Sequence, residues 1–302
     1  KEFIPNNVRH LMRALYSNNQ RDESKIQWPI EDRYLILLNH IFLEVENITG
    51  VSIFPLNLWK DNKTPFIITH DVENRNGFNR IYKLIELEEK YGFHSIFNFV
   101  PTRYNINQEL IDNLRSRGFD IGLHGLKHDG KLFWSKKAFN DRAIEMNKYL
   151  KIFNIKGFRS PLTHRNPEWL QKLDIEYDMS FFDTDPFEPI PGGTMCIWPF
   201  FMGNFVELPY TIPQDNQLFL IQGKKDISLW VEKVEMIKKW GGMILVNVHP
   251  DYINFKNNYG NNEYPVSLYE EFLSYMKNIG VWNPLPVEIA NYWNENFGIK
   301  RH

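Results

Sequence analysis

The stretch TPFIITHDVE, residues 64–73, joins an apolar run to a group of ionisable side chains. The apolar part, residues 65–69, is short and continuous, which is typical of a buried strand. His70, Asp71 and Glu73 follow it. Because alternate residues of an extended segment point the same way, the carboxylates of Asp71 and Glu73 are expected to share one face. The stretch therefore predicts a buried strand that ends in a pair of acids.

Strand and helix patterns alternate along most of the remaining chain. Amphipathic helix patterns, two of them stopped by a glycine, separate the apolar runs. We expect strands at residues 95–100, 119–123 and 243–248, a short one ending at 157–159, and helices at 77–91, 107–117, 135–153 and 226–240. This alternation predicts an α/β fold in which helices cover a parallel sheet or barrel.

The first part of the chain has a different pattern. Apolar residues recur at helical spacing in residues 7–16 and 30–45, and a polar stretch separates the two. We therefore predict an N-terminal helical extension over residues 1–60 and a main domain over residues 61–302. None of the residues in the extension suggests a chemical role.

The composition narrows the classes of function. The 302 residues carry a formal net charge of −2 without a polybasic block, so no overall field attracts nucleic acid or an anionic membrane. A single cysteine rules out a disulfide within the chain and a cysteine-rich zinc module. We expect no transmembrane segment, because no apolar run is long enough, and we find no signal-peptide pattern. The oligomeric state is left open.

Ionisable side chains follow the predicted strands at the same point in each unit. His124 and His128 come after the strand at 119–123, Arg159 ends the next strand, and His249 follows the strand at 243–248. In barrels of this kind, functional residues collect at the C-terminal ends of the strands. We therefore expect these side chains to gather near the acids of residues 64–73.

Two imidazoles and a carboxylate form a ligand set for a divalent metal with a position left open for water. Asp71 or Glu73 could supply the carboxylate, while the other acid takes a proton from the water. Arg159 could keep the base ionised, and His249 could protonate a leaving group. A carboxylate near that histidine would keep it protonated, and Asp178 is a candidate for this role.

These residues also have simpler structural interpretations. Glu73 could be a solvated surface acid, Arg159 a structural ion-pair partner, and His249 the plain end of a strand. A lone pair of histidines four residues apart is weak support for a metal site. The pair gains weight from the other groups, which occur in a consistent order along the chain.

The order of these groups resembles the motifs of the NodB-type polysaccharide deacetylases of carbohydrate esterase family 4. The family's Thr-Phe-Asp-Asp run corresponds to residues 69–73, and its His-Ser/Thr-x-x-His motif to residues 124–128. Its Arg-x-Pro motif corresponds to residues 159–161, and its final Leu-x-x-His motif to residues 245–249. The resemblance covers about residues 64–290.

The resemblance implies a distorted (β/α) barrel with an N-terminal helical appendage. It also implies a metal-dependent hydrolase that removes acetyl groups from the N-acetylated sugars of a bacterial cell-surface polysaccharide or its precursor, with O-acetyl groups as the less favoured alternative. An acetylated carbohydrate is the implied partner, and the bacterial cytoplasm and cell envelope are both compatible compartments. Glu73, His124 and His128 would hold the metal, which is expected to be Zn²⁺, with Co²⁺, Ni²⁺ or Fe²⁺ as alternatives.

By the same resemblance, Asp71 is the catalytic base, Arg159 holds the base and His249 is the catalytic acid. The family's fourth motif, an aspartate with a nearby tryptophan, is matched only loosely, by Asp178. The family's second adjacent aspartate is Val72 here, so the first motif resembles an Asp-x-Asp branch with glutamate in the second place. Gly125 replaces the usual serine or threonine of the histidine motif.

Two alternative functions fit the same residues. The chain could be a non-catalytic, glycan-binding relative that has lost the metal, an interpretation that Val72 and Glu73 favour. It could also be a related C–N hydrolase that acts on an amide outside sugars. Metal content distinguishes the first alternative from an enzyme, and a substrate screen distinguishes the second.

Overall fold

The computed structural model describes residues 28–52, 58–59, 61, 63–184, 193–256 and 262–298. The helix predicted over residues 7–16 lies outside these ranges. The strands are β1 (Phe66–Val72), β2 (Ile96–Phe99), β3 (Asp120–Leu123), β4 (Gly157–Phe158), β5 (Tyr177–Asp178), β6 (Phe200–Met202), β7 (Phe205–Glu207), β8 (Ile244–Asn247), β9 (Ile253–Asn254) and β10 (Tyr264–Pro265). The helices are α2 (Arg33–Thr49), α3 (Arg75–Phe78), α4 (Ile81–Tyr91), α5 (Gln108–Ser116), α6 (Lys136–Ile152), α7 (Pro167–Leu170), α8 (Ser228–Lys239), α9 (Val266–Asn278) and α10 (Pro286–Phe297), with shorter turns η2 (Pro161–Thr163) and η3 (Asn216–Ile221).

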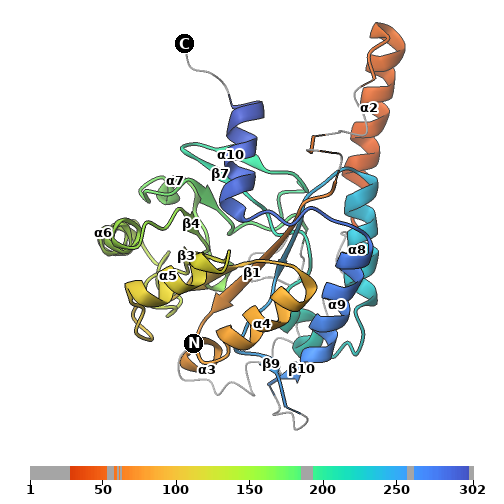
Figure 1. Ribbon diagram of the computed structural model, residues 1–302. Coiled ribbons are helices and arrows are strands. Elements are labelled where there is room, and N and C mark those ends of the chain that lie inside the picture. The colour runs from red at the N-terminus through yellow and green to blue at the C-terminus, as the bar shows by residue number, and fades with distance from the viewer. Residues whose placement is uncertain are drawn as a thin grey trace.

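Eight strands form one curled sheet in the order β6-β7-β5-β4-β3-β2-β1-β8, and helices surround it (Figure 1). All neighbouring pairs in this sheet are parallel except β6 and β7. The segment after β7 reaches back to β8, because the amides of Thr211 and Ile212 both donate to the Leu245 carbonyl. The α/β fold predicted from the sequence, a distorted (β/α) barrel, is therefore confirmed.

Strand β1 is central to the sheet and carries the stretch from which the fold was predicted. It pairs with β2 on one side and β8 on the other, and all of its residues are buried. Such burial of a parallel strand on both faces explains its continuous apolar run. The alternation of side chains directs Thr69 and Asp71 to one face, and His70 and Val72 to the other.

The helix predicted over residues 77–91 is wrong in one respect, because it is divided into α3 and α4. A distant part of the chain causes the break. The Arg80 guanidinium donates to the carbonyls of Pro250, Asp251 and Ile253, and the Asp251 carboxylate accepts from the Gly77 amide. These contacts tie the start of α4 to the segment after β8, which contains His249.

The N-terminal appendage is represented by α2, which projects from the main body (Figure 1). Leu35 is the buried residue of this helix, whereas Ile48 near its far end is 83% exposed. In the described ranges, no helix combines the length and the apolar character needed to cross a membrane. The predicted division between extension and main domain at residue 60 stays a prediction.

Aromatic side chains fill the core between β1 and the helices. Phe66 of β1 lies edge-on to Phe93 and to Phe272 of α9, with ring centroids 5.4 and 5.8 Å apart. Phe272 also packs against Trp230 of α8, and both rings are fully buried. Phe272 therefore joins two outer helices to the central strand.

Replacing Phe272 with alanine should lower the free energy of unfolding by about 3–5 kcal/mol, because it removes a large buried ring and leaves a cavity. Equilibrium denaturation followed by circular dichroism measures this change. Phe201→Ala serves as the matched control, since Phe201 is 42% exposed on the edge strand β6 and its loss should have little effect. Equal destabilisation by both variants would contradict this account of the core.

Candidate metal centre and active site

Glu73, His124 and His128 meet at the C-terminal ends of the central strands. Glu73 directly follows β1, His124 directly follows β3, and His128 lies in the loop after β3. One ligand atom from each residue lies within 4.8 Å of the others. The three donors are the imidazole and carboxylate types that divalent transition metals prefer.

The geometry around His124 fixes the tautomer of its ring. Nδ1 lies 3.0 Å from the Arg159 carbonyl oxygen, which can only accept, so Nδ1 carries the hydrogen. Burial lowers the pKa of His124 to about 4, so the ring is neutral at pH 7. Its Nε2 therefore holds a free lone pair, as a metal ligand requires.

His128 offers a buried nitrogen that lacks a hydrogen bond. Its Nε2 lies 3.0 Å from Glu73 Oε1, but the two groups are not aligned for a hydrogen bond. Burial by itself raises the pKa of Glu73, yet the neighbouring His128 outweighs it and lowers that pKa well below its usual range. Glu73 in turn outweighs burial and raises the pKa of His128, so the two groups form an ion pair. A divalent cation that bound both groups would displace the imidazole proton.

Gly125 lies between the two histidines where the resembled family has serine or threonine. Its φ is +64°, a conformation that favours glycine. A β-carbon at this position would also lie 2.5 Å from Cγ of Pro161. The backbone of this loop therefore requires glycine beside η2.

Asp71 lies next to the three candidate ligands, and its carboxylate is held from both sides. Asn98 of β2 donates to Oδ1 over 2.9 Å, and Asn247 of β8 donates to Oδ2 over 2.9 Å. Burial by itself raises the pKa of Asp71, but the neighbouring His124, Arg159 and His249 and the hydrogen bond from Asn98 lower it to about 2. The carboxylate is thus ionised and fixed in orientation at neutral pH.

The register of β1, β2 and β3 explains how Asn98 reaches Asp71. Asp71 pairs with Asn98 in the register of β1 and β2, and Asn98 pairs with Gly122 of β3. A β-carbon on Gly122 would lie 2.1 Å from Asn98 Oδ1. Glycine at this position therefore leaves the space that the Asn98 amide occupies.

Arg159 approaches the same carboxylate from the end of β4. Its Nη1 lies 3.7 Å from Asp71 Oδ2, and its Nη2 donates to Thr69 Oγ1 over 3.1 Å. The guanidinium also lies over the Tyr210 ring, 5.2 Å from the ring centroid. These contacts give the buried cation an anionic partner and fix its position.

His249 is paired with Asp215 rather than with Asp178, the residue expected from the sequence. Nδ1 of His249 lies 2.6 Å from Asp215 Oδ1, and its backbone amide donates to Oδ2. Tyr264 donates to the same carboxylate. Burial by itself lowers the pKa of His249, but Asp215 outweighs it and raises the pKa to about 10. The imidazole is therefore protonated at neutral pH.

Asp178 lies in a different part of the sheet, and this corrects the expectation that it accompanies His249. It belongs to β5, which four strands separate from β8. Its Oδ1 accepts from Ser180 Oγ over 2.6 Å, and its register partner on β7 is Glu207. Burial raises the pKa values of both Asp178 and Glu207, and Asp178 raises that of Glu207 further, which fits a structural pair that shares a proton.

Sequence reasoning missed four polar residues that contact the centre. Tyr252 donates to Glu73 Oε2 over 3.0 Å, and the other three are Asn98, Asn247 and Asp215. Asn98 could have been found, because an amide inside a buried apolar strand calls for a partner. Asn247 also carried a signal, since it shares a strand face with His249. Asp215 follows no strand, so no pattern in the sequence pointed to it.

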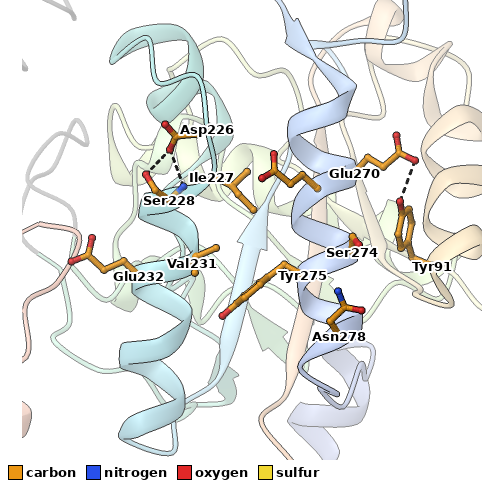
Figure 2. A pocket seen from close by; sticks show the side chains of 11 residues that line it. Tyr91, Asp226, Ile227, Ser228, Val231, Glu232, Glu270, Ser274, Tyr275 and Asn278 are labelled. Atoms are coloured by element: carbon orange, nitrogen blue, oxygen red, sulfur yellow. Dashed lines mark hydrogen bonds between the residues drawn. The ribbon is translucent and has the colours of Figure 1, made fainter.

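A hollow on the surface between α8 and α9 offers no comparable set of ligands (Figure 2). Asp226 at the start of α8 accepts hydrogen bonds from Ser228, and Glu270 of α9 accepts them from Tyr91 and Lys90. The residues lining the hollow include no histidine and none of the residues that form or contact the centre at the strand ends. The centre at the strand ends is therefore the candidate functional site.

Replacing Asp215 with asparagine should lower the pKa of His249 well below its native value of about 10, because the carboxylate that most strongly opposes burial is removed and only the weaker influence of Glu73 and Asp71 remains. The imidazole of His249 should therefore lose its proton at a lower pH in the variant than in the native protein. NMR titration of imidazole-labelled, metal-free protein measures the pKa, with His249→Gln assigning the signal. Asp226→Asn is the control, and an unchanged pKa in Asp215→Asn would contradict the pairing.

No protein-family model and no curated protein matches this sequence. Solved structures do match it in fold. A candidate polysaccharide deacetylase from Mycobacterium smegmatis has a TM-score of 0.56 and 18% identity, covering 78% of this chain and 91% of its own. A second one, from Pseudomonas aeruginosa PAO1, has a TM-score of 0.61 and 13% identity over 80% and 95%. The allantoinase Puue has the same TM-score and identity over 80% and 93%. The chain therefore has the fold of these proteins, as the resemblance of its motifs predicted.

Proposed function

We propose that the protein is a metal-dependent hydrolase that removes acetyl groups from N-acetylated sugars of a bacterial cell-surface polysaccharide or its precursor. The observation that carries this proposal is the arrangement at the strand ends. Three candidate ligands, Glu73, His124 and His128, lie close together, and an ionised carboxylate, Asp71, and a protonated imidazole, His249, lie near them. Hydrolysis of an amide needs this combination of a base, an acid and an electrophile.

Glu73, His124 and His128 would hold the metal, and Asp71 would stay free to act as a base. Tyr252 supports this division, because its hydroxyl orients the Glu73 carboxylate, whereas two amides orient Asp71. When bound, a divalent metal would act as a Lewis acid toward the acetyl oxygen and would lower the pKa of water. Zn²⁺ is the proposed ion, and Co²⁺, Ni²⁺ or Fe²⁺ suit the same donors.

The residues of the chain would move two protons during the reaction. Asp71 would accept a proton from the water as its oxygen bonds to the acetyl carbon. The C–N bond would then break, and His249 would give its Nε2 proton to the leaving nitrogen. Acetate and a free amine would be the products. Asp215 would stabilise the imidazolium before this transfer, and Arg159 would hold Asp71 ionised.

The carbohydrate substrate is inferred from the fold and from the resemblance of the motifs. Two of the similar folds are candidate polysaccharide deacetylases, which supports an acetylated glycan as substrate. The allantoinase among them supports, as a second candidate function, a C–N hydrolase acting on an amide outside sugars. Assays with an acetylated chito-oligosaccharide and with non-sugar amides distinguish the two.

Replacing His124 with alanine should abolish metal binding, because it removes one of three ligands. Metal content of the purified protein, measured by mass spectrometry, should fall from about one ion per chain to near zero. Acetate release from an acetylated chito-oligosaccharide should fall with it. His40→Ala on the exposed face of α2 is the control. An intact, metal-free His124→Ala protein with full activity would rule out the proposed mechanism.

Replacing Asp71 with asparagine should reduce kcat by about 10²–10⁴-fold, because it removes the proposed base. Metal content should be unchanged, since Asp71 is not a proposed ligand. Acetate release and metal content are measured on the same preparation, with Asp141→Asn on the surface of α6 as the control. Acetate release at the native rate would exclude Asp71 as the base, and loss of the metal would identify it as a ligand.

A further inference from the structure

The segment after β2, residues 102–104, contacts the backbone on both sides of the candidate metal centre. The Tyr104 hydroxyl donates to the carbonyl of Val72, the last residue of β1. The Thr102 hydroxyl donates to the Leu126 carbonyl over 2.5 Å. The segment thus holds β1, which leads to the candidate ligand Glu73. It also holds the loop of residues 124–128, called the histidine loop below.

Arg103, in the middle of this segment, binds both sides with one side chain. Its Nη1 donates over 2.6 Å to Oδ1 of Asn74, the neighbour of Glu73. Its Nε donates to the Lys127 carbonyl over 3.3 Å, and its Nη2 donates to the His128 carbonyl over 3.1 Å. The guanidinium therefore connects the residue after one candidate ligand to the backbone of another.

The histidine loop has a physical need for such support. His128 has a φ of +47°, in the left-handed region that residues other than glycine adopt at a cost. A ligand in this conformation needs surrounding contacts that hold it there. The hydrogen bond from Arg103 to the His128 carbonyl is such a contact, and the planar fork of an arginine can serve several acceptors at once.

We propose that Arg103 is a positioning residue for the metal centre, which joins the segments of Glu73 and His128 and so raises the affinity of the site for divalent metal. The inference rests on the proposed metal site and adds a residue outside the ligand set. Partners of this kind, which hold ligands without touching the ion, change metal affinity by about 10–100-fold when they are removed.

The charge of Arg103 by itself would have the opposite effect on metal affinity, which makes the inference testable. Arg103 carries a positive charge beside a site that would bind a dication. If charge were its main effect, its removal would strengthen metal binding. If positioning is its main effect, its removal weakens metal binding despite the lost repulsion.

The test measures the Zn²⁺ dissociation constant of metal-free protein by competition with a chelator of known affinity. Arg103→Ala should weaken Zn²⁺ binding by about 10–100-fold relative to the native protein. Arg103→Lys should stay clearly weaker than native, because one ammonium group cannot bridge the acceptors of both segments. Hydrogen exchange of the metal-free proteins should show faster exchange of the 126–130 amides in both variants.

Arg117→Ala is the matched control, because Arg117 also makes two hydrogen bonds to one partner, Glu89, on the helices away from the site. Its Zn²⁺ affinity should equal the native value. Native affinity or tighter binding in Arg103→Ala would overturn the inference while leaving the proposed function intact. Full native affinity in Arg103→Lys would overturn the bridging role. A native protein that binds no Zn²⁺ would overturn both the proposed function and this inference.

Discussion

The alternation of side chains along β1 is the constraint on which the site depends. Every second side chain points to the same face, which carries Thr69, Asp71 and Glu73. These are, in order, the residue that Arg159 contacts, the proposed base and the proposed metal ligand, and they form one row along the chain. The residues between them face the helices, where His70 lies 2.6 Å from Glu88 of α4. A shift of one residue would exchange the two sets. Val72 can therefore replace an acid without disturbing the row.

Burial and hydrogen-bond partners give identical side chains different charges in this centre. His124 faces a backbone carbonyl, and burial is the main influence on its pKa, so the ring is neutral. His249 faces the Asp215 carboxylate, which outweighs burial and keeps the ring charged. One imidazole is thus suited to bind a cation and the other to donate a proton. The difference in charge, on which the proposed roles depend, follows from these neighbours, because the intrinsic pKa of the two side chains is the same.

The sequence allowed the strand ends to be predicted, because apolar runs and the polar residues after them are local signals. The α/β fold and the gathering of His124 with Glu73 follow from such signals and from the parallel sheet. The partner of His249 could not be predicted in this way, since Asp215 lies in a segment with no strand. The break before α4 depends on Arg80 and on carbonyls about 170 residues away. Contacts at such separation leave no periodic pattern in the sequence.

A crystal structure of the Zn²⁺-loaded protein with anomalous scattering tests the central claim most directly. The account predicts one anomalous peak at about 2.0–2.2 Å from a Glu73 carboxylate oxygen and from Nε2 of His124 and His128. Asp71 should lie outside the coordination sphere, still bound by its two asparagines. A peak coordinated by Asp71 in place of Glu73, or the absence of a peak between the two histidines, would contradict it.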